Sequence, residues 1–241
     1  MSDQSTYLLD GVRETEVGVY ERSWWRILHA LSFMVGGALF IVGTVLLFLP
    51  PSTYPDAPFQ SALLYVIGSC GFLCVDVMEF FTFHECPLRG NILMSAVGST
   101  FYVIGSAGFL PHIYTETSVY GIYGFILGSV IIGTSQTWKT IRLAGEEVPQ
   151  LGNDYGKKKP TIWVYSVRTL FSSKDIFTAA GVEASAGIGA WSFFVGTWLL
   201  SIHENSSEWY RIVLYIWVFG SVAFTTGAFF LAYRHFVMKV T

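Results

Sequence analysis

The stretch Gly36-Gly37-Ala38-Leu39-Phe40-Ile41-Val42-Gly43-Thr44-Val45-Leu46-Leu47 contains no charged residue and no Pro. It lies within a longer apolar run, and a helix of about 20 apolar residues is long enough to cross a bilayer. Six such runs occur, near Trp25–Leu49, Ser61–Phe83, Ile92–Leu110, Val119–Trp138, Ile176–Ile202 and Trp209–Phe230. The sequence therefore predicts an all-α, polytopic integral membrane protein with six transmembrane helices.

The composition of the whole chain leads to the same class of protein. Of the 241 residues, 52% are hydrophobic and only 13% are charged, whereas soluble domains carry about 25% charged residues. The mean hydropathy is +0.50. This apolar fraction excludes intrinsic disorder, and 3 Cys residues are too few for a disulfide scaffold. A net charge of -3 without a large basic face argues against a nucleic-acid partner.

Turn residues and polar stretches divide the chain into five segments. These are a polar N-terminal tail (1–23), membrane hairpin 1 (24–84), membrane hairpin 2 (91–144), a cytoplasmic-side loop (145–173), and membrane hairpin 3 with a short tail (174–241). Within the loop, Thr161–Phe171 combines aromatic, aliphatic and basic residues. We expect this stretch to be either an interfacial helix on the membrane surface or a docking segment.

The positions of the basic residues predict the orientation. With six helices, all of the 14 Lys and Arg residues except Arg211 fall on the side that holds both termini. Cytoplasmic loops are enriched in Lys and Arg, so we expect both termini on the cytoplasmic or equivalent inner side. Asn205-Ser206-Ser207 is an N-glycosylation sequon on the other side. Its loop is short and close to the bilayer, so we expect the sequon to be unused.

The six runs share a motif of the form aromatic-aliphatic-aliphatic-Gly-[Ser/Thr], which makes each pair of runs one copy of a repeated hairpin. The motif occurs as Phe40-Ile41-Val42-Gly43-Thr44, Tyr65-Val66-Ile67-Gly68-Ser69, Tyr102-Val103-Ile104-Gly105-Ser106, Phe125-Ile126-Leu127-Gly128-Ser129, Phe193-Phe194-Val195-Gly196-Thr197 and Trp217-Val218-Phe219-Gly220-Ser221. Small residues let membrane helices approach closely, and hydroxyl groups can hydrogen-bond between helices. The candidate packing residues are Gly43, Thr44, Gly68, Ser69, Gly105, Gly128, Gly196 and Gly220.

This hairpin resembles the YrhK-like family of small bacterial membrane proteins, in which a two-span unit carries Gly-Ser in each helix. The first hairpin matches best, through Phe40–Thr44 and Leu64–Ser69, and the third matches less well. The chain departs from the family by having three hairpins. The second run also ends in Phe81-Thr82-Phe83-His84, where the family has a basic Arg-Pro ending. The resemblance covers the membrane portion and implies a fold unit, with no biochemical activity.

Ionisable residues inside the predicted helices are the candidate polar sites. Asp76 and Glu79 lie one helical turn apart near the inner end of the second run, and three interpretations stay open: structural pairing with a base or water, an ion or proton pathway, and a metal site. A 60-residue shift between the first two hairpins places Glu79 level with Lys139, so they would pair if their helices adjoin. Glu183 is either an intramembrane carboxylate or an interfacial one.

Three further side chains have less specific interpretations. We expect His29 to be an interfacial histidine near the start of the first helix. Cys70 and Cys74 are expected to be buried packing residues.

The sequence contains no phosphate-binding Gly-rich loop and no His-Glu-x-x-His, Cys-x-x-Cys or Gly-x-Ser-x-Gly motif. We therefore expect no enzyme, no catalytic residue, no cofactor and no metal. The leading hypothesis is a structural or assembly subunit whose Gly/Ser/Thr faces pack against other membrane helices, in a homo-oligomer or a larger complex, with membrane lipids around it. The alternative is a transporter or channel whose inner mouth includes Asp76 and Glu79.

Overall fold

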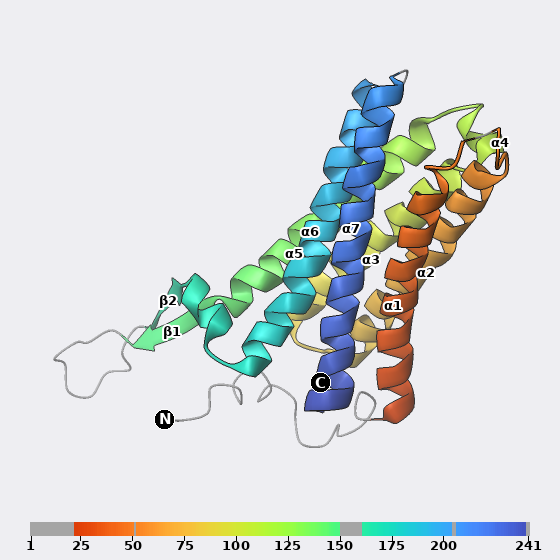
Figure 1. Cartoon of the computed structure of the whole chain (residues 1–241). Helices are drawn as coiled ribbons and strands as arrows, with labels where there is room; N and C mark the ends of the chain where they lie inside the picture. Colours follow the sequence, from red (N-terminus) through yellow and green to blue (C-terminus); the bar gives the residue numbers. More distant parts are fainter. Residues whose placement is uncertain (1–21, 51, 150–160, 204–205, 240–241) are drawn as a thin grey trace, which may run out of the picture.

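The computed structural model describes residues 22–50, 52–149, 161–203 and 206–239, and most of them are helical (Figure 1). The predicted all-α fold class is confirmed. The long helices are α1 (Ser23–Leu46), α2 (Ala57–Thr82), α3 (Cys86–Gly108), α5 (Val119–Leu143), α6 (Lys174–Ile202) and α7 (Ser207–Tyr233). The short elements are α4 (Pro111–Tyr114), β1 (Gly145–Pro149), β2 (Thr161–Tyr165), a 3-10 helix η2 (Val167–Phe171) and a π-helical turn η3 (Arg234–Met238).

Local sequence explains where several helices begin. A Pro occupies the first or second position of α2, α3 and α4, where its fixed φ suits a helix and its missing N–H costs no hydrogen bond. Ser173 caps α6 by accepting a hydrogen bond from the backbone N–H of Ile176. Ser206 caps α7 in the same way through Trp209.

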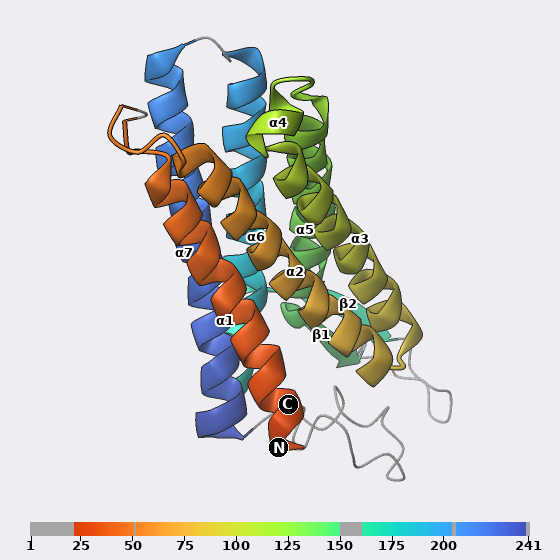
Figure 2. The ribbon, with the colours of Figure 1, turned by 90° about the vertical axis from the view of Figure 1, so that its right-hand side faces the viewer.

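The six long helices form a closed ring. Each packs mainly against two neighbours, in the order α1, α2, α3, α5, α6, α7 and back to α1. Helices α1 and α7, which are far apart in the sequence, thus lie side by side, and Figure 2 shows both at one side of the bundle. Helix α1 begins and α7 ends at the end of the bundle drawn lowest in Figure 1, which we call the lower end. The opposite end, which carries α4, is the upper end.

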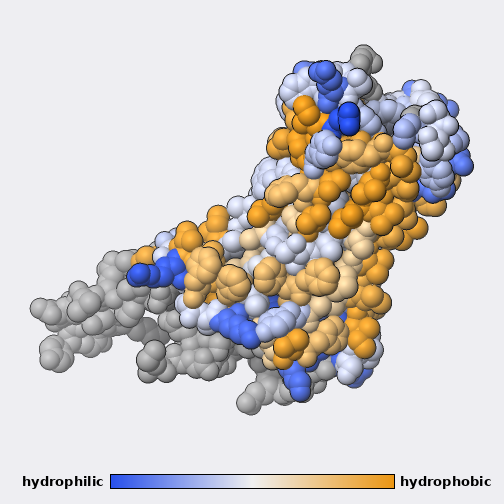
Figure 3. Space-filling model, viewed as in Figure 1, coloured by the Kyte–Doolittle hydropathy of each residue, from blue (hydrophilic) through white to orange (hydrophobic). Residues whose placement is uncertain are grey.

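Among the described residues, five helices are long and apolar enough to cross a membrane: α1, α2, α5, α6, and α7 continued through η3. Helix α3 has 23 residues, about 35 Å at 1.5 Å per residue, but it is more polar because it contains Arg89, Asn91 and several serines. The outward faces of the helices are apolar over the middle of the bundle, and hydrophilic residues gather towards its ends (Figure 3). Such a surface suits contact with lipid and indicates a membrane-embedded, multi-pass protein.

Glycines set the distances between neighbouring helices. A Cβ built on any of the six glycines named as packing residues would lie within 3.0 Å of an atom in another helix of this chain. At Gly124 of α5, for example, the added atom would be 2.6 Å from the Cα of Gly105 in α3. The two backbones are therefore nearly in contact, which only glycine permits. The small-residue faces are used inside this bundle.

The interfacial helix expected over Thr161–Phe171 is wrong for its first half. Residues Thr161–Tyr165 form strand β2, which pairs antiparallel with β1, with Gly145 opposite Tyr165. The sequence Thr-Ile-Trp-Val-Tyr is β-branched and aromatic throughout, which favours a strand. Only Val167–Phe171 is helical, as the single 3-10 turn η2.

The expected burial of the two cysteines of α2 is also wrong, since Cys70 is exposed and Cys74 is only half-buried. The interior face of this part of α2 is formed by Gly68, Ser69 and Phe72, so Cys70 lies on the outward side. The sequon residue Asn205 lies outside the described residues.

Candidate functional site

Six aromatic side chains, one from each long helix, fill the middle of the ring. We call them the aromatic layer: Phe40, Tyr65, Tyr102, Phe125, Phe193 and Trp217. None is more than 2% exposed. The ring centroids of Phe40 and Tyr65 are 4.9 Å apart, and those of Phe40 and Phe193, which belong to different hairpins, are 5.3 Å apart. Aromatic rings at these separations attract one another, so the six rings form one buried, packed layer inside the ring.

Several hydroxyl groups around the aromatic layer are hydrogen-bonded, although that of Thr197 has no partner among the described residues. Thr44 Oγ1 donates to the carbonyl oxygen of Phe40 at 2.8 Å and lies 2.7 Å from the Tyr65 hydroxyl. Ser69 of α2 and Ser106 of α3 have their oxygens 3.0 Å apart, and both side chains are buried. In the copies of the sequence motif that contain Thr44, Ser69 and Ser106, the Gly allows close approach and the hydroxyl bonds within or between helices.

A cavity of about 150 Å³ lies inside the ring on the lower side of the aromatic layer. Its position follows from helix direction, because Asp76 and Glu79 come after Tyr65 on α2, whereas Glu183 comes before Phe193 on α6. The five ionisable residues that line the cavity are Asp76, Glu79, Lys139, Glu183 and Arg234. Its apolar wall includes Phe33, Phe72 and Phe224. The cavity is therefore charged on part of its wall and aromatic on another.

Lys139 lies between two carboxylates. Its Nζ is 3.4 Å from Glu79 Oε2 and 3.6 Å from Glu183 Oε2, so the ion pair expected between Glu79 and Lys139 is present. Glu183 is not isolated, because it shares this cation with Glu79 inside the ring. Its depth in the membrane stays a prediction. Paired charges of opposite sign satisfy one another where water is scarce. The three side chains join α2, α5 and α6 across the bundle interior.

His29 has a more specific place than the sequence indicated. Its imidazole is buried, with Nε2 3.2 Å from Glu79 Oε1 and Nδ1 3.0 Å from Nε2 of His235 in η3. Trp25 stacks on the same ring at 4.5 Å between centroids. His29 is therefore buried where the turn η3 packs beside the start of α1, and its position at the membrane interface stays a prediction. Sequence reasoning missed His235 altogether, and only knowledge that the first and last helices adjoin could have linked the two histidines.

Asp76 does not share the ion pairs of Glu79, although the two residues lie on one face of α2. Ser99 Oγ of α3 donates to Asp76 Oδ2 at 2.5 Å. Within the part of the chain that the structure describes, Asp76 forms no ion pair. Gln136 of α5 lines the same cavity, is only 8% exposed, and its Oε1 has no hydrogen-bond partner among the described residues.

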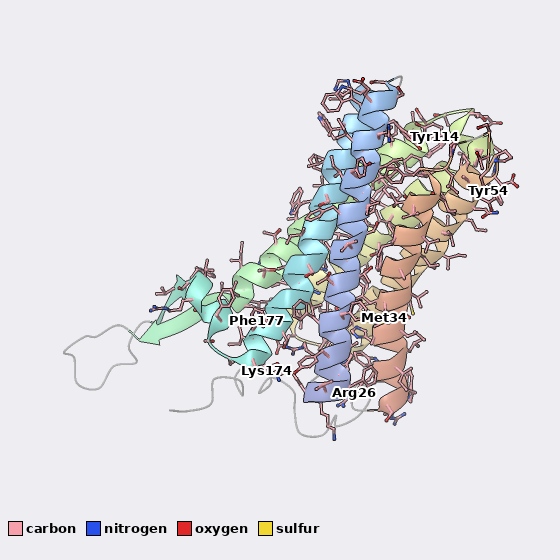
Figure 4. All side chains as sticks on the ribbon, viewed as in Figure 1. Arg26, Met34, Tyr54, Tyr114, Lys174 and Phe177 are labelled. Carbon is pink, nitrogen blue, oxygen red and sulfur yellow. The ribbon has the colours of Figure 1, made fainter. Side chains whose placement is uncertain are left out.

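The two ends of the bundle carry different kinds of residue. Figure 4 shows Arg26 and Lys174 at the lower end, and Tyr54 and Tyr114 at the upper end. At the lower end, Arg234 forms an ion pair with Asp175 at 2.8 Å. The cavity thus lies towards the end that carries Arg26, Lys174 and Arg234.

No group of three or more His, Cys, Asp or Glu side chains among the described residues is arranged to hold a metal ion. No family model, curated protein or solved structure matches this chain.

Proposed function

We propose that this chain is a membrane transport protein that takes up a small polar solute in the cavity beneath the aromatic layer. The observation that carries the proposal is that a charged cavity and a layer of packed aromatic rings lie within one ring of helices. A cavity lined by Asp76, Glu79, Lys139 and Glu183 lies on one side, and tightly packed rings separate it from the other side. Ionisable residues inside a membrane bundle are expensive to bury and commonly mark substrate or ion pathways.

The aromatic layer would act as the closed gate of this pathway. In the state described, the cavity is on the side of the helix ends that carry the basic residues, and the layer blocks the way to the upper end. Transport then requires the layer to open, by movement of at least one hairpin relative to the others. Phe40 contacts rings of several other helices, so it is a central part of the gate.

We propose for the membrane portion six spans arranged as three hairpins, with both termini on the inner side. The position of α3 between α2 and α5 in the ring supports the sixth span. Equivalent contacts support the repeat, because in each hairpin a Gly of the second helix faces an aromatic residue of the first: Gly68 and Phe40, Gly128 and Tyr102, and Gly220 and Phe193. The likeness of this unit to the YrhK-like hairpin stays a prediction.

The observation that favoured a structural subunit has another explanation in this structure. The structural-subunit hypothesis relied on Gly/Ser/Thr faces that would pack against partner helices, and these faces contact helices of the same chain. The outward faces are formed by large apolar side chains such as Val42, Ile67 and Leu127, which suit lipid. A transport role uses the interior of the bundle, which a purely structural role leaves without a purpose.

The test is solute flux in liposomes containing the purified full chain. Stopped-flow light scattering after an osmotic step would measure the entry of choline chloride, sodium gluconate and urea as cationic, anionic and neutral probes. We expect entry of one class above that of protein-free liposomes. Phe40→Ala should increase the flux by loosening the aromatic layer, whereas Phe229→Ala, on the exposed face of α7, should not. Flux equal to that of empty liposomes for every probe would refute transport.

A further inference from the structure

We infer that the cavity binds a small organic ammonium ion, with Asp76 as the counter-charge and Gln136 as a hydrogen-bond acceptor. The first support is the balance of charge on the wall. Lys139 is shared by Glu79 and Glu183, and Arg234 is paired with Asp175 outside the lining. Asp76 is the cavity carboxylate that forms no ion pair among the described residues, and Lys139 acts on it only from beyond ion-pair distance. A buried charge needs a partner, and a bound cation would supply it.

The second support is independent of the acidic residues. Gln136 is more than nine-tenths buried and lines the cavity, yet its Oε1 accepts no hydrogen bond from the described residues. A buried polar atom without a partner costs about 1–3 kcal/mol, so such atoms are usually satisfied when the site is occupied. Ser95 lines the same cavity, and its hydroxyl, which hydrogen-bonds Asp76, adds another oxygen. An N–H-bearing cation satisfies these acceptors together.

The rest of the wall selects an organic cation over an inorganic one. Phe33, Phe72 and Phe224 line the cavity, and the rings of Phe72 and Phe224 have their centroids 5.0 Å apart. Aromatic faces attract ammonium groups and also accommodate their alkyl chains. A volume of about 150 Å³ is the size that holds a benzene-sized molecule. The described residues also contain no metal-binding cluster, so a compact primary ammonium ion fits better than a metal ion.

The experiment measures binding to the purified full chain in detergent micelles, so that it does not depend on transport. Propylammonium chloride is the probe, 1-propanol is its neutral counterpart, and NaCl and KCl are the inorganic controls. Isothermal titration calorimetry and the shift in melting temperature report binding, because a ligand that binds the folded state stabilises it. We expect propylammonium to bind, and the other three to have little effect at the same concentration.

Three variants identify the site. Asp76→Asn keeps the hydrogen bond from Ser99 but removes the charge, and we expect at least a tenfold loss of propylammonium affinity. Gln136→Met keeps the volume and should weaken binding several-fold, which preserves the test if Asp76→Asn does not fold. Glu85→Gln alters a carboxylate that pairs with Arg142 away from the cavity and should leave affinity unchanged.

The outcomes separate this inference from the proposed function on which it rests. No binding of propylammonium, equal binding by Asp76→Asn and Gln136→Met, or tighter binding of Na⁺ or K⁺ would each overturn the ammonium site. Binding that depends on Asp76 together with no flux in liposomes would leave the site standing and refute transport. Flux of another solute without propylammonium binding would refute the site alone.

Discussion

Replacing Lys139 by Gln removes the one cation that Glu79 and Glu183 share. The Lys139 side chain is 10% exposed, and those of the two carboxylates are 19% and 22% exposed. Breaking a buried ion pair by removing one partner costs about 3–5 kcal/mol. His29 still contacts Glu79, and the polar cavity is large enough for water, so we expect a loss of about 3 kcal/mol in the free energy of unfolding.

The opposite change should cost less. Glu79→Gln leaves Lys139 paired with Glu183, so we expect a loss of about 1–2 kcal/mol, less than the full cost of breaking a buried pair. In the double variant Glu79→Gln/Lys139→Gln, Glu183 is the one carboxylate of the pair that keeps its charge, so two unpaired carboxylates no longer face one another. Its loss should therefore fall short of the sum of the single losses by at least about 1 kcal/mol, the range found for residues in contact.

The assay is equilibrium unfolding in mixed micelles with increasing fractions of a denaturing detergent, followed by tryptophan fluorescence and circular dichroism. The control is Glu85→Gln, because the Glu85–Arg142 pair is 3.2 Å long but about a third exposed on both sides. Exposed pairs contribute about 0–1 kcal/mol. The reasoning is refuted if Lys139→Gln costs no more than Glu85→Gln, or if the two cavity substitutions are additive.

Three further predictions concern packing and orientation. Gly124→Ala should lower the free energy of unfolding by about 2 kcal/mol, because the new Cβ would meet backbone atoms and overpacking costs about 1–3 kcal/mol. Gly90→Ala has open space around the new Cβ and should stabilise α3 by up to about 1 kcal/mol. Equal effects of the two substitutions in detergent unfolding would contradict this. Ser106→Ala should cost about 1 kcal/mol by removing a buried hydroxyl partner, and a melting temperature unchanged from wild type would count against it. In a chain without its native cysteines, Ser166→Cys should react with an impermeant maleimide only from the inner side and Ser52→Cys only from the outer side; labelling of both from one side would overturn the proposed topology.

The sequence was sufficient for the long helices because each apolar run is bounded by Pro, Gly or polar residues. The run expected near Val119–Trp138 corresponds to α5, and the run at Ile176–Ile202 corresponds to α6. The repeat register also placed Glu79 level with Lys139, and the two are in contact. These features follow from local composition and from the spacing of one motif, and both can be seen in a single sequence.

Features that depend on which helices adjoin could not be read from the chain. The contact of His29 with His235 exists because α7 closes the ring against α1. The sequence of neither helix indicates that the other is its neighbour. Helix periodicity shows that a Gly lies on a small-residue face, but the same face would serve an internal neighbour or a partner protein. The prediction likewise treated Asp76 and Glu79 as one acidic site. In the structure, Asp76 accepts a hydrogen bond from Ser99 of α3 and does not take part in the ion pairs of Glu79.

The closed ring has a consequence for the synthesis of the protein. A chain emerging from the ribosome delivers α1 and α2 first. Of the side-chain contacts that Glu79 makes with described residues, only the one with His29 can form when Glu79 enters the bilayer. Lys139 follows on α5, Glu183 on α6, and His235 arrives only with the last residues. A charge without its partner is costly in lipid, so the early hairpin must be held in a protein-lined or hydrated environment until its neighbours arrive. Truncated nascent chains that end before α5 are therefore the ones we expect to remain bound to the insertion machinery.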